Sequence, residues 1–227
     1  TGVVRCWGRN LAGVVDPENL GTTSFPAPTR VTWVAGPVRI DGGGGHLCAL
    51  HGDHSLFCVG LNARGQLGDG TTDYRILPVR VRPPTGLSGA FESMSAGGGH
   101  TCAVVFDGYG GCWGENSQGQ IGIGTTSFSE PSFRPVLAMP DVFYGFGTPS
   151  RPAAGGSHSC VAMNNGTITC WGDNSGGQIG DGTTVDALYP TDVVLPGGVP
   201  DFLDVVAGGG PTCARRAGAT LWCWGAN

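Results

Sequence analysis

The chain has 227 residues, of which 40% are hydrophobic, so it is long enough to form a substantial core. Only 13% of the residues are charged and the net charge is -5, which argues against the basic surface that nucleic-acid binding requires. All 12 basic residues are arginines, and the absence of lysine excludes a Walker-type phosphate loop, a Schiff-base enzyme and a lysine general base. No apolar run has the length of a membrane span.

The N-terminal segment, residues 1–31, opens in the middle of a motif that returns along the whole chain. The fragment CWGRN starts at Cys6, and Gly13-Val14-Val15-Asp16 follows where later copies have Gly-Gln-Leu/Ile-Gly. This first copy is therefore predicted to be degenerate, with a remodelled loop. A strand is expected next, over residues 32–40.

Three fuller copies and a shorter last one follow. They are HLCALHGDHSLFCVGLNARGQLGDGTT from His46, HTCAVVFDGYGGCWGENSQGQIGIGTT from His100, HSCVAMNNGTITCWGDNSGGQIGDGTT from His158 and PTCARRAGATLWCWGAN from Pro211. The second cysteine of each copy falls at residues 6, 58, 112, 170 and 223, with spacings of 52, 54, 58 and 53. Such a period is typical of propeller blades and other repeat architectures, whose units bury their faces only against neighbours.

Within each copy the sequence predicts two strands joined by a short turn. Residues 101–105 alternate small and apolar side chains, residues 167–171 are β-branched and aromatic, and a strand over 202–206 begins the last copy. If residues 106–108 form a three-residue hairpin loop with its glycine in the left-handed conformation, Val104 faces Gly110 and Cys102 faces Cys112. The α-carbons of that cysteine pair are then about 4.5 Å apart, within the range of a disulfide.

The cysteines support this register, because eight of the nine form pairs separated by ten residues. We expect a disulfide in each pair, and four disulfides imply an oxidising compartment. Buried free thiols and metal binding are the alternatives, although zinc sites usually contain C-x₂₋₄-C knuckles that this chain lacks. Cys6 is expected to be unpaired, since its partner would precede Thr1, and both ends are expected to continue into further sequence. The predicted pairs are Cys48/Cys58, Cys102/Cys112, Cys160/Cys170 and Cys213/Cys223.

Other recurring polar residues are expected to be structural. The histidines at 46, 100 and 158 occupy equivalent places, as do the asparagines at 10, 62, 116 and 174 and the glutamines at 66, 120 and 178. A residue repeated in every copy is more typical of a hydrogen-bonded structural group than of one catalytic base, and such amides commonly satisfy turn backbone groups. The cluster His51-Gly52-Asp53-His54 is either a polar hairpin tip or a cation site.

The longest connection, residues 127–152, is a candidate partner-binding loop. It is rich in proline and aromatic residues, and loops carried by a rigid scaffold are where binding residues gather. The alternative is that its rings cover the gap between two blades. The candidate residues are Phe128, Phe133, Phe143, Tyr144 and Phe146.

The pattern C-W-G-x-N-x-x-G-Q-[IL]-G-x-G-T-T, preceded by G-G-x-H-x-C, resembles the regulator of chromosome condensation repeat and covers essentially the whole chain. The resemblance implies an all-β fold, a β-propeller of four-stranded blades, of which about four are visible here as part of a ring that usually has seven. The expected repeats are 7–58, 59–112, 113–170 and 171–224. The cysteine-paired version is similar to secreted or surface-anchored bacterial members of the family.

Members of that family act as exchange factors, light sensors or enzyme inhibitors, and they share the binding of proteins through rim loops. We therefore expect a non-catalytic, secreted or cell-surface scaffold that binds a protein partner, with no cofactor, no metal and no nucleic acid. One alternative is a structural subunit that self-assembles into an extracellular fibre or coat. Another is a polysaccharide-binding or polysaccharide-degrading propeller, which would need a carboxylate pair, and the nearest candidates are Asp201 and Asp204.

Overall fold

The computed structural model describes residues 3–10, 13–16, 21–31, 36–83, 85–87, 89–106, 108–136, 151–163, 165–194, 197–198 and 201–226. The regular elements assigned to these residues are β-strands, grouped into five antiparallel sheets. In this part of the chain no helix is long and apolar enough to cross a membrane. The prediction of an all-β fold is confirmed.

Three of the sheets contain four strands each, and every strand pairs with the next one along the chain. Sheet II consists of β3 (Pro37–Gly42), β4 (His46–His51), β5 (Leu56–Gly60) and β6 (Arg75–Arg80). Sheet III consists of β7 (Phe91–Ala96), β8 (His100–Val105), β9 (Gly110–Asn116) and β10 (Ser127–Pro135). Sheet IV consists of β11 (Pro152–Ala154), β12 (His158–Ala162), β13 (Ile168–Gly172) and β14 (Ala187–Asp192).

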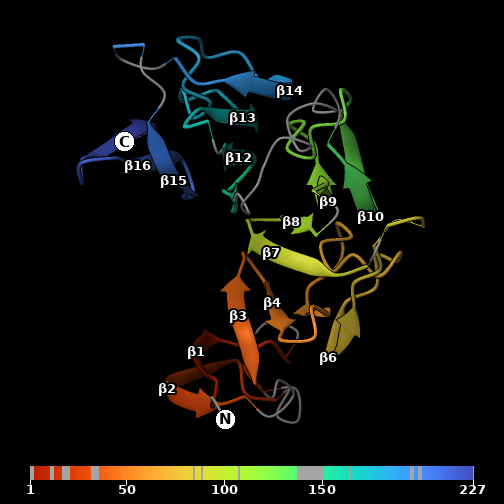
Figure 1. Cartoon of the computed structure of the whole chain (residues 1–227). Coiled ribbons are helices and arrows are strands. Elements are labelled where there is room, and N and C mark those ends of the chain that lie inside the picture. Colours follow the sequence, from red (N-terminus) through yellow and green to blue (C-terminus); the bar gives the residue numbers. More distant parts are fainter. Residues whose placement is uncertain are drawn as a thin grey trace.

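Two smaller sheets flank these three. Sheet I contains β1 (Arg5–Arg9) and β2 (Ser24–Arg30), and sheet V contains β15 (Phe202–Ala207), β16 (Pro211–Arg216) and β17 (Leu221–Gly225). Figure 1 shows the sheets following one another around an arc, with the N-terminal sheet at one end and the C-terminal sheet at the other. Four-stranded meanders in this arrangement form part of a β-propeller.

A separate layer of apolar side chains fills the gap between each pair of neighbouring sheets from II to V. A meander has two faces, so it buries both only when a sheet packs on each side. The layers contain, among others, Leu67, Trp113 and Phe133 between sheets II and III, Ile121, Val161 and Trp171 between III and IV, and Ile179, Phe202 and Val205 between IV and V.

The central hairpins have the register that the sequence predicted. Val104 pairs with Gly110 and Cys102 with Cys112, and Gly108 has a φ of 81°, in the left-handed region. Four disulfides join the second and third strands, each with α-carbons 4.1 Å apart, and Cys6 is free. The disulfides are Cys48–Cys58, Cys102–Cys112, Cys160–Cys170 and Cys213–Cys223.

The predicted long loop after residue 126 begins instead with a strand, because β10 occupies Ser127–Pro135 and pairs with β9. Within a sheet, proline is tolerated where its missing N–H would not have donated to a neighbouring strand. The outermost strand has one edge that faces no neighbour, so proline can be placed there. The proline content of this stretch therefore marks an outermost strand, which the sequence did not distinguish from a loop.

Candidate functional site

A buried polar chain crosses each of the three junctions from sheet II to sheet V. At the first of them, His46 Nε2 lies 2.8 Å from Thr101 Oγ1, and the Thr101 hydroxyl donates to the Gln66 carbonyl at 2.8 Å. The Trp113 indole donates to the same carbonyl at 2.9 Å. Because the hydroxyl proton is used on Gln66, the His46 ring donates from Nε2.

The same chain repeats at the next two junctions. His100 contacts Ser159 at 2.9 Å and His158 contacts Thr212 at 2.8 Å. The hydroxyls of Ser159 and Thr212 donate to the Gln120 and Gln178 carbonyls, which also accept from Trp171 and Trp224. A histidine on one sheet, a hydroxyl on the next and a loop carbonyl between them thus connect neighbours in a repeated unit.

Burial makes these histidines poor proton acceptors. Desolvation lowers the pKa of His46 and of His158 to about 4, and desolvation together with the neighbouring histidines lowers the pKa of His100 to about 3. A general base that acts near neutral pH needs a pKa close to 7 and access to a substrate. The recurring histidines therefore have a structural role, as the sequence predicted.

The glycines before each histidine allow neighbouring sheets to approach at this level. Gly44 N donates to Gly97 O at 3.1 Å, and Gly98 N donates to Gly155 O at 2.9 Å. A Cβ added to Gly98 would lie 2.4 Å from the Gly156 carbonyl oxygen, too close for any other residue. The G-G-x-H motif therefore encodes contact between sheets rather than a ligand site.

The recurring amides satisfy turn backbone groups, which confirms the sequence prediction. Asn62 Oδ1 accepts from Leu67 N at 2.9 Å, and Asn62 Nδ2 donates to Thr71 O at 3.0 Å. Gln66 Oε1 accepts from Arg64 N at 3.0 Å. Equivalent bonds are made by Asn116, Asn174, Gln120 and Gln178.

The predicted partner-binding aromatics divide into different environments. Phe133 is 5% exposed, stacks on Trp113 and belongs to the layer between sheets II and III, so its ring is not available to a partner. Phe128 is 67% exposed, and the Arg64 guanidinium lies 3.7 Å from its ring centroid. Phe143, Tyr144 and Phe146 lie outside the described residues. Phe133 is thus corrected to a core residue that fills the gap between sheets.

An apolar surface lies along the outermost strands, and of its residues only Phe128 was predicted from the sequence. It consists of five exposed side chains on or beside β6, β10 and β14, which we call the rim surface. Its exposed members are Tyr74, Leu77, Phe128, Val185 and Tyr189. The register places Leu77 and Tyr189 at equivalent positions of sheets II and IV. Comparing the fourth strand of each copy would have revealed these positions.

The carboxylates that the sequence offered as metal ligands or catalytic groups bond to neighbouring protein groups. Asp53 accepts from the backbone N–H and hydroxyl of Ser55, and the His54 ring packs against Phe106. Asp201 pairs with Arg216, and Asp204 accepts from Val205 N at 3.0 Å. Within the part of the chain that the structure describes, no three His, Cys, Asp or Glu side chains are grouped so that they could hold a metal ion.

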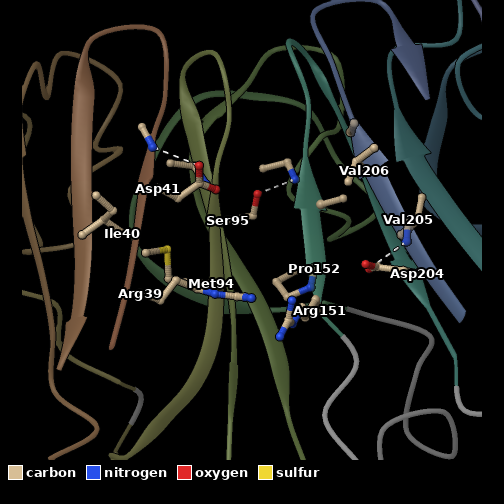
Figure 2. Close-up of a pocket in the computed structure, with 15 residues that line it drawn as sticks. Arg39, Ile40, Asp41, Met94, Ser95, Arg151, Pro152, Asp204, Val205 and Val206 are labelled. Carbon is tan, nitrogen blue, oxygen red and sulfur yellow. Dashed lines mark hydrogen bonds between the residues drawn. The ribbon is translucent and has the colours of Figure 1, made fainter. Parts of the chain in front are cut away.

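The four innermost strands, β3, β7, β11 and β15, line a cavity of about 450 Å³ (Figure 2). Asp41 Oδ2 accepts from Ala96 N at 3.0 Å, and Ser95 Oγ accepts from Ala154 N at 3.1 Å. These bonds connect the innermost strands of successive sheets. Three of the four strands that line the cavity, β3, β7 and β11, are therefore joined by hydrogen bonds between sheets.

Successive meanders around an inner cavity, joined by repeated contacts between sheets, define a partial β-propeller. Models of the regulator of chromosome condensation (RCC1) repeat match residues 53–104 and 153–178. The chain therefore contains RCC1 repeats.

Among curated proteins, the chain is 28% identical over 227 residues to human E3 ubiquitin-protein ligase HERC2, covering 99% of this chain and 5% of HERC2. Among solved structures, human WBSCR16 matches with a TM-score of 0.81 at 17% identity, covering 97% of this chain and 56% of WBSCR16. Prp20p of Saccharomyces cerevisiae matches with a TM-score of 0.73 at 23% identity, covering 92% of this chain and 50% of Prp20p. The chain therefore spans about half of each of these solved propellers and a small part of HERC2.

Proposed function

We propose that this chain is a non-catalytic, secreted or cell-surface propeller segment that binds another protein through its rim surface. The observation that carries this proposal is the exposure of Tyr74, Leu77, Phe128, Val185 and Tyr189 on successive outermost strands. An outermost strand that faces only water tends to carry polar side chains, whereas repeated exposed aromatic and aliphatic residues are typical of contact surfaces.

The rim surface also has the composition of a protein interface. Tyrosine, phenylalanine and arginine are enriched where proteins bind one another, and Arg64 lies on the ring of Phe128. The Prp20p structure is described together with its binding to Gsp1p and histones, so a propeller of this fold does bind proteins. The partner of this chain is proposed to be a protein with a complementary apolar patch.

The compartment is proposed from the disulfides. Four disulfides in one chain are typical of an oxidising environment, because cytosolic reductants keep thiols reduced. In protein isolated from its source, alkylation before reduction is expected to label Cys6 alone, and alkylation after reduction to label all nine cysteines of this segment. Labelling of all nine without reductant would contradict the proposal.

The binding role is tested with a variant of the rim surface. The triple variant Leu77→Ser/Phe128→Ser/Tyr189→Ser removes three exposed apolar side chains from three successive sheets. Proteins retained by the native chain from the medium or cell surface of its source are expected to be lost, because truncating a central contact typically costs about 2 kcal/mol, roughly a thirtyfold loss of affinity.

A matched control changes exposed aliphatic residues elsewhere. The variant Val38→Ser/Val194→Ser/Leu203→Ser alters side chains that are 67%, 63% and 57% exposed, and it should retain the same proteins. Equal retention by both variants, or no specific retention by the native chain, would contradict binding through the rim surface.

Self-assembly is the second candidate, favoured by sheet V. Among the described strands β17 pairs only with β16, and its residues Leu221 and Trp222 are 69% and 38% exposed. A strand with a free edge can pair with another chain. Light scattering at increasing protein concentration distinguishes self-assembly from binding to another protein. Self-assembly predicts that the mean mass rises with concentration and that Trp222→Glu abolishes the rise. Binding to another protein alone predicts a constant mass.

A further inference from the structure

The inner cavity contains two arginines whose side chains have no acidic partner. Arg39 on β3 and Arg151, immediately before β11, both line it. Four other arginines each have a carboxylate within 4.0 Å: Arg64, Arg75, Arg134 and Arg216. Within the described residues, neither Arg39 nor Arg151 has such an ion pair. Neither guanidinium group is therefore held in a direct ion pair by a described carboxylate, although Asp41 and Asp204 also line the cavity.

The strand register brings the two arginines to the same level of the cavity. Asp41 pairs with Cys48 and Ala153 pairs with Cys160, so these residues are equivalent, and Arg39 and Arg151 each lie two residues earlier. In Figure 2 the Arg39 side chain extends from β3 across β7, and its guanidinium group lies toward Arg151. Two sheets that are not neighbours thus direct their cations to one place.

The two acidic residues that line the cavity, Asp41 and Asp204, accept hydrogen bonds from backbone N–H groups. Asp41 Oδ1 accepts from Gly42 N at 2.9 Å and Oδ2 accepts from Ala96 N, while Asp204 Oδ1 accepts from Val205 N. Burial and the charge of Arg151 lower the pKa of Arg39, whereas Asp41 and Asp204 act in the opposite direction. The two like charges repel one another, and a bound anion would relieve that repulsion.

We propose that this cavity binds a small oxyanion, held by the guanidinium groups of Arg39 and Arg151. A guanidinium presents a planar fork of N–H donors that fits the oxygens of a phosphate or carboxylate, and two forks can hold one anion from two sides. A volume of about 450 Å³ has room for such an anion with water. The inference concerns the innermost strands and does not rest on the rim surface.

The same oxygen chemistry has two sources, a free oxyanion and an acidic side chain of another polypeptide. Titration of the full chain with inorganic phosphate tests the first, and titration with a hexaglutamate peptide tests the second, both by calorimetry at constant ionic strength. Saturable phosphate binding supports a free oxyanion as ligand. Binding of the peptide alone supports the same site with a carboxylate side chain as its occupant.

The variants are Arg39→Gln, Arg151→Gln and the double variant. Each single change is expected to weaken binding about tenfold or more, because a charge-assisted hydrogen bond is worth about 1.5–3 kcal/mol, and the double variant should show no saturable binding. Arg80→Gln, an exposed arginine on the outermost strand β6, is the matched control and should bind as the native chain does.

Thermal unfolding gives a second measurement that separates loss of binding from loss of folding. Phosphate should raise the melting temperature of the native chain and of Arg80→Gln, and leave that of the double variant unchanged while its spectrum stays native. The proposal would be overturned if neither phosphate nor the peptide bound. It would also be overturned if the native chain and the double variant bound the probe equally.

Discussion

The junction between sheets II and III differs from the junction between sheets I and II, although both are formed by the same repeat. Thr101 and Trp113 pair across β8 and β9, and both donate to the Gln66 carbonyl. The equivalent pair in sheet II is Leu47 and Val59, which have no polar side-chain groups. One junction therefore contains the histidine-hydroxyl-carbonyl chain, and the other lacks its hydroxyl and its indole.

The residue whose backbone carbonyl accepts these bonds also differs between the two junctions. Val14 takes the place of Gln66, and its Cγ1 would lie 2.6 Å from a Cβ added to Gly60, much as the Gln66 backbone approaches Gly114. The first junction is filled instead by Val31 and Ala49, with Val4 and Cys6 packed against them. A buried polar network is stable when complete and costly when half removed, so the hydroxyl and the indole are expected to be present or absent together.

The largest expected effect is a loss of stability in acid, caused by the buried histidines of the junctions between sheets II and V. The pKa values of about 4, 3 and 4 for His46, His100 and His158 lie below the usual 6.5, so the unfolded chain binds protons first. Their contribution to stability is complete above pH 6.5 and is lost as the pH falls toward 4, by up to about 3 kcal/mol per histidine. Urea unfolding followed between pH 7 and pH 4 measures this loss.

A histidine variant identifies the source of that pH dependence. His100→Gln should reduce the slope of unfolding free energy between pH 6.5 and pH 4 by about one third, because one of three depressed groups is removed. His54→Asn removes a histidine at the exposed hairpin tip and serves as the control, and a reduction as large as that caused by His100→Gln would contradict the role of the buried ring. A stability profile that is flat across this window would contradict the neutral, buried state of the three rings.

The next largest effect is expected when the later junction is given the side chain of the first. Trp113 is 0% exposed, and Trp113→Val copies Val59 into sheet III without the accompanying changes. The loss of ring packing and of the bond to Gln66 should lower the unfolding free energy by about 3–5 kcal/mol. Trp222→Val, at a side chain that is 38% exposed, should cost less than about 1 kcal/mol, and similar losses for both would contradict the packing account.

The smallest effect concerns the hydroxyl alone. Thr101→Leu copies Leu47 and leaves the His46 Nε2–H without an acceptor, which should cost about 1–3 kcal/mol in urea unfolding. In the double variant His46→Leu/Thr101→Leu both partners are apolar. The double loss should be smaller than the sum of the single losses by about 1 kcal/mol, whereas strict additivity would show that the two side chains do not act together.

Local spacing made much of this fold predictable. A ten-residue separation with a glycine turn fixes the hairpin register, so Cys102 opposite Cys112 followed from counting residues. The amide of Asn62 bonds within its own turn, only five and nine residues ahead, and its role was predicted for the same reason. The disulfide pairs and turn contacts required no knowledge of how the sheets pack.

The candidate site was predicted less well, because its residues meet only through packing. Phe128 and Phe133 belong to one proline-containing strand, yet Phe128 is exposed to solvent and Phe133 lies in the layer between sheets. Two register shifts in β10 prevent its buried face from being counted from simple alternation. The exposed Leu77 and Tyr189 were missed because residues of the outermost strands were not compared between copies. A side chain's sheet face cannot be assigned while its segment is taken for a loop.

By itself the sequence determined the repeat, the strand content, the hairpin register and the cysteine pairs, since each depends on residues close together in the chain. The tertiary structure alone decided that His46 meets Thr101 on the next sheet and that Arg39 and Arg151 line one cavity. Those contacts depend on how whole sheets stack around the inner cavity. Stacking is set by the summed fit of many apolar side chains and glycine approaches, which no single local pattern encodes.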